Sequence, residues 1–123
     1  MPMVGSGDGW WSFVHVEDVA AATALAIERG SAGNVYNIVD DEPARVGEWL
    51  PALAAMLAAK PPRHVPAWLA RFAVGEHLVV MMRQVRAGSN AKAKQDLGWQ
   101  PAHPSWRQGF TEIVRQRRSG TAK

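Results

Sequence analysis

The chain has 123 residues, of which 47% are hydrophobic and 20% charged, an ordinary balance for a globular domain. It contains no cysteine, which excludes disulfides and thiolate metal sites. No apolar run approaches the roughly 20 residues that span a bilayer, and the start of the chain lacks the pattern of a signal peptide, so we expect a cytoplasmic protein without a membrane segment.

The net charge of +3 comes largely from basic residues near the end of the chain. A basic segment that closes a helix is usually solvated and complements the helix dipole. We therefore treat nucleic-acid binding as the least favoured function. The residues concerned are Arg115, Arg117, Arg118 and Lys123.

The glycine-rich segment Gly5–Gly9 has the first two glycines of a dinucleotide-binding loop, at positions 5 and 7, but not the third. Trp10 stands where the third glycine of G-x-G-x-x-G is required. A strand rather than a helix is expected to follow. The sequence predicts a loop or turn here and no phosphate site.

The next segment predicts a strand, a helix and a second strand within residues 1–43. Phe13–Val16 is rich in β-branched and aromatic residues, which favours a strand. A helix is predicted from Asp18 to Arg29, with Asp18 interpreted as its cap and Gly30 as its stop. The length of this predicted strand–helix–strand segment matches that of one βαβ crossover.

The second strand, Val35–Val39, is apolar on both faces apart from one asparagine. Such strands usually lie inside parallel sheets, and this chain offers few strands to pair with it. We therefore expect an incomplete sheet. We also expect the strand to associate with a second copy, to recruit the N-terminal segment, or to be only partly ordered. The acidic run Asp40–Glu42 is interpreted as a solvated turn.

The remainder, residues 44–123, is predicted to be mainly helical. Gly75 is expected to divide one helical segment, Gly98 to close another, and Ser105 to open the last through a capping box with Gln108. The expected helices are Gly47–Ala59, a segment beginning at Pro66, Leu78–Arg86, Ser89–Leu97 and a final helix after Ser105.

Four blocks of sequence resemble one family. They are Phe13–Ala20 (FVHVEDVA), Val35–Pro43 (VYNIVDDEP), Ser89–Ala93 (SNAKA) and Leu97–Pro101 (LGWQP). In this order they resemble the C-terminal part of extended or atypical short-chain dehydrogenases, the NAD-dependent epimerase/dehydratase-like proteins. The resemblance implies an α/β fold: a helix-rich C-terminal fragment of a Rossmann-type enzyme with two or three short strands.

The family's catalytic machinery is not found in this sequence. The resemblance implies a Tyr-x-x-x-Lys pair, but the single tyrosine, Tyr36, is followed four residues later by Asp40. A glycine-rich strand–turn–helix for the pyrophosphate is also missing. We therefore expect no catalytic and no cofactor-binding residue here, and NAD or NADP only for a full-length parent. The chain is interpreted as a truncated or separately encoded substrate-binding region, 1–123, inactive alone.

Four residues are candidates for a substrate pocket: Trp11, His15, Met82 and Arg86. Trp11 stands where the resemblance implies an arginine that contacts a nucleotide diphosphate. Because an indole has one donor and no charge, this position favours a less charged, more apolar substrate. For His15, Met82 and Arg86 the sequence favours ordinary packing roles, and a pocket role is the second interpretation.

The histidines suggest no metal site by spacing, so no metal ligand is predicted. Two other classes of function stay open. One is a non-enzymatic binding or interaction module derived from the same fold, and the other is the basic nucleic-acid-binding protein. The histidines outside the pocket candidates are His64, His77 and His103.

Overall fold

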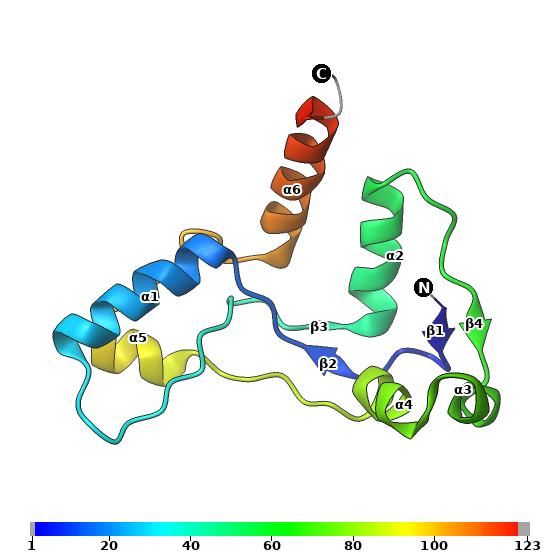
Figure 1. Cartoon of the computed structure of the whole chain (residues 1–123), viewed down its shortest axis with the longest axis horizontal. Coiled ribbons are helices and arrows are strands. Elements are labelled where there is room, and N and C mark those ends of the chain that lie inside the picture. Colours follow the sequence, from blue (N-terminus) through cyan, green and yellow to red (C-terminus); the bar gives the residue numbers. More distant parts are fainter. Residues whose placement is uncertain (1, 121–123) are drawn as a thin grey trace. The chain divides into compact units, whose positions relative to one another are not determined.

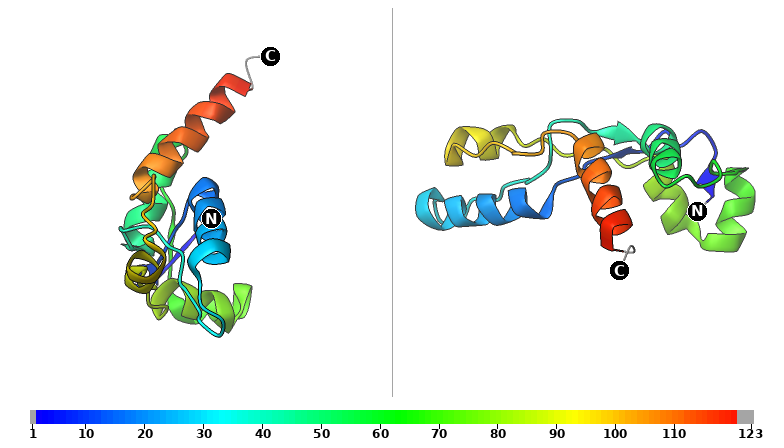
Figure 2. Two further views of the ribbon diagram at one scale, coloured as in Figure 1. Left: turned by 90° about the vertical axis from the view of Figure 1, so that its left-hand side faces the viewer. Right: turned by 90° about the horizontal axis from the view of Figure 1, so that it is seen from above.

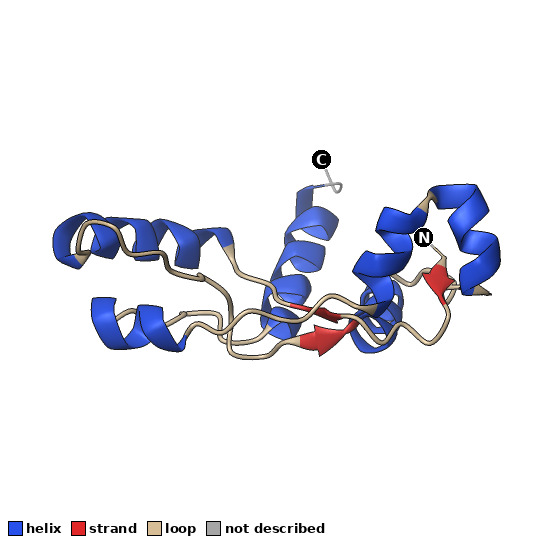
Figure 3. Cartoon of the chain, turned by 90° about the horizontal axis from the view of Figure 1, so that it is seen from below, coloured by secondary structure: helices blue, strands red, loops and turns tan. Residues whose placement is uncertain are grey.

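The computed structural model of the chain describes residues 2–120. Helices dominate this part of the chain, and its strands are only two residues long (Figures 1 and 3). The elements are β1 (Met3–Val4), β2 (Trp10–Trp11), α1 (Val16–Arg29), β3 (Ala44–Arg45), α2 (Val46–Met56), β4 (His64–Val65), α3 (Ala67–Val74), α4 (Glu76–Arg83), α5 (Ala91–Leu97) and α6 (Trp106–Gly120). Among residues 2–120, no helix combines the length and apolar character that crossing a membrane requires.

The structure separates into two compact units. Unit 1 takes residues 2–11, 44–87 and 114–120, and unit 2 takes residues 12–43 and 88–113. Each unit is therefore assembled from segments that are distant in sequence. Helix α6 contributes its first part to unit 2 and its last part to unit 1.

Unit 1 holds both strand pairs. β1 pairs in parallel with β4, with Met3 opposite His64, and β2 pairs antiparallel with β3, with Trp10 opposite Arg45. Two strands of two residues bury little by themselves, so the helices of unit 1 supply most of the core. Its buried side chains include Met3, Val4, Ala44, Val46, Trp49, Leu50, Ala70, Val79 and Met82.

The glycine-rich segment forms a tight turn against the start of α2. Gly7 has φ of 66°, a left-handed conformation that favours glycine. Gly47 N–H donates to the carbonyl of Gly7 at 2.9 Å. A Cβ on Gly7 would lie 2.6 Å from the nitrogen of Gly47, so no larger residue fits. The predicted turn is confirmed, and its glycines serve close packing of two backbones.

Unit 2 is built on the pair α1 and α5, which lie side by side (Figures 1 and 2). Ala22 of α1 packs with Ala93 and Leu97 of α5 around the indole of Trp99. The predicted helix stops behave differently: Gly98 adopts the left-handed conformation with φ of 63°, whereas Gly30 is extended with φ of −67°.

The two strands predicted in unit 2 do not form. Neither Phe13–Val16 nor Val35–Val39 is a strand, and α1 already begins at Val16. A backbone hydrogen bond from Asp40 N–H to the carbonyl of Phe13, at 2.6 Å, joins the two regions. A β-strand forms only where its backbone hydrogen-bonds to a second strand. An apolar composition favours a strand but does not provide this partner. The expectation that sheet pairing would be incomplete is confirmed.

Candidate functional site

An apolar pocket lies along α2 in unit 1. It has a volume of about 360 Å³. Its lining is mostly aliphatic and aromatic, with one cation at the rim, which suits an apolar or aromatic small molecule. The lining residues are Trp49, Leu50, Leu53, Ala54, Leu57, Ala59, Lys60 and Pro62.

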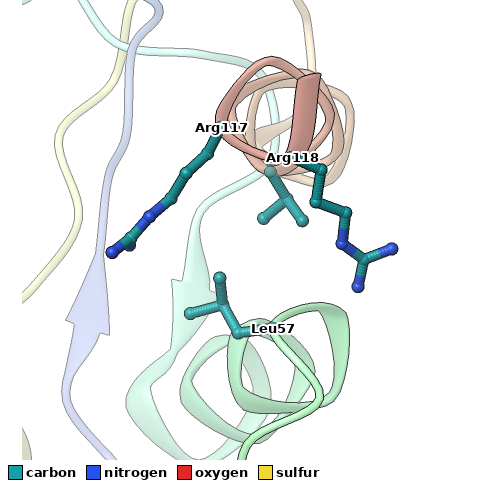
Figure 4. Close-up of a pocket in the computed structure, with 4 residues that line it drawn as sticks. Leu57, Arg117 and Arg118 are labelled. Atoms are coloured by element: carbon teal, nitrogen blue, oxygen red, sulfur yellow. The ribbon is translucent and has the colours of Figure 1, made fainter. Parts of the chain in front are cut away.

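A second pocket, of about 490 Å³, shares Leu57 with the first and adds two cations (Figure 4). Leu57 follows the last residue of α2, while the side chains of Arg117 and Arg118 extend from α6 to either side of the opening. Arg118 Nη2 donates to the carbonyl of Met56 at 3.1 Å, which ties its guanidinium to the end of α2. The two pockets together present an apolar surface with a basic rim.

Trp11 lies behind the apolar pocket. Its ring centroid is 5.1 Å from that of Trp49, which lines the pocket. Its indole Nε1–H donates to the carbonyl of Met81 at 2.8 Å. Trp11 thus holds the end of α4 and one wall residue of the pocket in fixed positions.

Of the four predicted pocket residues, three belong to unit 1 and one to unit 2. Met82 is completely buried in the core of unit 1, and Arg86 is exposed in the same unit. The backbone of Trp10, next to Trp11, donates to the carbonyl of Val85, next to Arg86, at 2.8 Å. His15 belongs to unit 2. A common pocket role for the four residues stays a prediction.

His15 is part of a cluster that the sequence did not predict. Its imidazole stacks on that of His103 with centroids 3.9 Å apart. His103 Nε2 is 3.3 Å from a carboxylate oxygen of Glu112, and its Nδ1 is 3.4 Å from a carboxylate oxygen of Asp18. We call His15, His103 and Glu112 the His–Glu cluster.

Asp18 does not cap its own helix, which corrects the interpretation made from the sequence. The cap of α1 is His15, whose side chain accepts from Glu17 N–H. Asp18 is buried, with 2% of its surface exposed. Its carboxylate accepts from Ala102 N–H at 2.7 Å and His103 N–H at 3.0 Å. Asp18 therefore fixes the loop that carries His103.

The acidic run after Val39 is also bound to its surroundings and is not a simple solvated turn. Burial raises the pKa of Asp40 to about 6. A side-chain hydrogen bond from Lys94 lowers the pKa of Asp41, and one from Ser105 lowers that of Glu42. The pKa of Asp40 is thus shifted in the opposite direction from those of its two neighbours.

Asn90 connects this acidic run to α5. Its side-chain amide donates to the carbonyl of Val39 at 2.8 Å and to the carboxylate of Asp41 at 2.7 Å. The sequence suggests a cap at Ser89. The residue that directly precedes α5 is Asn90, whose side chain makes no cap hydrogen bond, while Ser89 Oγ accepts from Ala91 N–H at 3.3 Å. The long-range role of Asn90 has no local signal, because its partners lie in a distant segment.

Sequence comparison finds similarity to one family model and to one curated protein. A model described as the NAD dependent epimerase/dehydratase family matches residues 1–39. A curated Streptomyces protein, 3-diazoavenalumate denitrifying reductase, is 40% identical over 110 residues. That match covers 89% of this chain and 36% of the relative. The chain therefore spans about a third of the curated relative's length.

Solved structures resemble nearly the whole chain. A conserved protein of unknown function from Silicibacter pomeroyi has a TM-score of 0.79 at 24% identity, over 95% of this chain and 42% of that one. The human epimerase family protein SDR39U1, solved with NADPH, has a TM-score of 0.71 at 20% identity, over 93% and 38%. These identities support the fold alone. The predicted fold class is confirmed: α/β and helix-rich, with an incomplete sheet.

Proposed function

Because this chain is related to the NAD-dependent epimerase/dehydratase family, we propose that it is a substrate-binding portion that works only with a separate cofactor-binding half. Its sequence has no Tyr-x-x-x-Lys pair and no glycine fingerprint, the groups that would move a proton and hold a pyrophosphate. The parent reaction would then use NAD or NADP, as the names of the matched family and of the NADPH-bound structure suggest.

The observation that carries the proposal is the apolar pocket along α2 with its basic rim. Trp49 and the leucines of α2 offer an apolar lining, whereas Lys60 offers a cation. Arg117 and Arg118 add two more cations around Leu57. Apolar walls with a few convergent polar groups are the usual features of a small-molecule site. We propose that the substrate is a small aromatic or apolar molecule with a carboxylate.

Two further observations agree with this substrate class. Trp11, at the position of the arginine that the family resemblance implies, brings no charge for a diphosphate. The related Streptomyces protein is named as a reductase of 3-diazoavenalumate. A sugar nucleotide would instead require strong charge-assisted contacts to its phosphates.

Ligand binding tests the proposal directly. Titration of the chain with cinnamate, followed by amide NMR shifts, is expected to perturb residues along α2 before any others. Leu53→Arg should abolish the response, because it places a bulky charged chain in the pocket wall. Leu69→Arg is the matched control, since Leu69 lies on α3 with 45% of its surface exposed. Shifts scattered over the whole chain, or equal in both variants, would contradict the proposed site.

One observation favours a different function, that of an interaction module. Helix α3 exposes large apolar side chains: Trp68 is 65% exposed and Phe72 is 88% exposed. Apolar groups of this size in water are typical of surfaces that bind another protein. If cinnamate and other aromatic carboxylates fail to bind while Trp68→Ser abolishes association with a cofactor-binding half supplied in trans, the interaction function is favoured over the substrate pocket.

A further inference from the structure

We propose that the His–Glu cluster binds a divalent transition-metal ion, with Zn²⁺ as the expected occupant. The cluster offers one ligand atom from each of His15, His103 and Glu112, and these atoms all lie within 4.8 Å of one another. Imidazole nitrogen and carboxylate oxygen bind Zn²⁺ at about 2.0–2.2 Å. The three donors are therefore close enough to meet at one ion once one of the two rings has turned.

The carboxylate of Asp18 prepares His103 for this role. It lies 3.4 Å from Nδ1 of His103, while Nε2 of the same ring lies 3.3 Å from Glu112. A metal-bound histidine commonly gives its other ring N–H to a carboxylate, which fixes the tautomer and the ring orientation. Asp18 is itself held by two backbone N–H groups. Nδ1 of His103 is buried and makes no hydrogen bond in the part of the chain that the structure describes, so its bond to Asp18 would form when Nε2 binds the ion.

His15 is oriented by the start of α1. Glu17 N–H donates to its Nδ1 at 3.3 Å, so that nitrogen is an acceptor and Nε2 is left for a metal. The two imidazoles are now stacked, with 25° between their planes. A metal ion lies close to the plane of each ring that binds it, so one ring must turn. Loss of this stack is a structural signature that binding should produce.

The charge around the cluster favours a cation. Glu112 and Asp18 face the two edges of the His103 ring, and Glu17 lies 4.0 Å from Nδ1 of His15. Three carboxylates thus surround two imidazoles. Three protein ligands also leave a fourth coordination position, which water or a ligand atom fills in zinc sites of this type.

Titration of the intact chain with ZnCl₂, followed by imidazole NMR, tests the proposal without any mutation. We expect saturation at one ion per chain, with shifts at His15 and His103 and none at His64 or His77. His64 Nδ1 donates to the carbonyl of Gly5 at 3.0 Å in unit 1, outside the cluster. Unchanged resonances of His15 and His103 would overturn the proposal.

Calorimetry on variants supplies the quantitative test. His15→Asn keeps an N-cap side chain but removes Nε2, and Glu112→Gln keeps the size of the side chain but removes its charge. Each is expected to weaken Zn²⁺ binding at least about tenfold, and Asp18→Asn by a similar factor. His77→Asn, at an exposed position of α4, is the control and should bind as the parent does. Equal affinity in Glu112→Gln and the parent would show that the ion pair with His103 is purely structural.

Discussion

The indole of Trp99 donates a hydrogen bond of 3.1 Å to the backbone carbonyl of Asp18. Trp99 is 1% exposed and Asp18 is 2% exposed, so the bond lies in the interior of unit 2. It joins the first turn of α1 to the segment that follows α5. Two of the sequence blocks that carry the family resemblance, Phe13–Ala20 and Leu97–Pro101, are thus in direct contact. A substitution in one block therefore changes the packing of the other.

We expect Trp99→Phe to destabilise the chain by about 1–3 kcal/mol, because it removes this hydrogen bond and leaves a small cavity in the core. Chemical denaturation followed by far-ultraviolet circular dichroism measures the change. Trp68→Phe is the control, since Trp68 is 65% exposed, and its effect should stay within about 0.5 kcal/mol. Equal effects of the two substitutions would contradict the role assigned to Trp99.

The helices of this chain follow from its sequence because their signals are local. The α1 periodicity and the left-handed stop at Gly98 predict helix positions to within a few residues. The strand signal at Val35–Val39 is equally clear but requires a partner strand, and none pairs with it among residues 2–120. One face of that segment does pack inward, through Tyr36 and Ile38, as a period of two predicts.

The candidate sites are harder to predict than the helices, because each site depends on contacts between segments that are distant in sequence. The pocket along α2 is lined mainly by aliphatic and aromatic side chains, which the sequence alone does not distinguish from core residues. The His–Glu cluster joins the start of α1 to residues near the end of the chain. No spacing rule connects His15 with His103, because the contact depends on the loop that Asp18 holds.

Asp18→Ala should lower the free energy of unfolding by roughly 2 kcal/mol, because it leaves two partly buried backbone N–H groups without their acceptor. Asp18→Asn keeps one acceptor oxygen, so we expect a smaller loss. Asp8→Ala, at an exposed position, is the control. Urea unfolding of the three variants gives the ranking, and a silent Asp18→Ala would contradict the anchoring role.

The pKa of Asp40 predicts a pH dependence of stability. Its folded value of about 6 is above the ordinary 3.8, so the protonated form is favoured in the folded state. The resulting stability is complete below pH 4 and is lost as the pH rises through about 6. Asp40→Asn removes this loss. We expect the variant to be more stable than the parent at pH 8, on the order of 2 kcal/mol.

The difference between the Asp40→Asn variant and the parent should vanish below pH 4. The lowered pKa values of Asp41 and Glu42 act in the acid range, where stability falls as they protonate. Their contribution is common to both proteins and cancels. Thermal unfolding from pH 3 to pH 8 is the measurement, and a constant difference across this range would show that Asp40 is not the titrating group.

Self-association is predicted for the segment Val35–Val39. Val35 is 80% exposed, and exposed apolar residues on an unpaired extended segment favour pairing with another chain. Sedimentation velocity at several concentrations should show association that Val35→Lys weakens. Ile27→Lys, at an 82% exposed position of α1, is the control. A chain that stays monomeric at all concentrations would contradict this prediction.

The central claim is that this chain supplies a substrate pocket and no dinucleotide site. Nicotinamide fluorescence, recorded while NADPH or NADH is titrated with the purified chain, tests it most directly. We predict no saturable change with either cofactor, because neither the glycine fingerprint nor the Tyr-x-x-x-Lys pair is present in the sequence. A saturable increase in fluorescence at one cofactor per chain would contradict the claim.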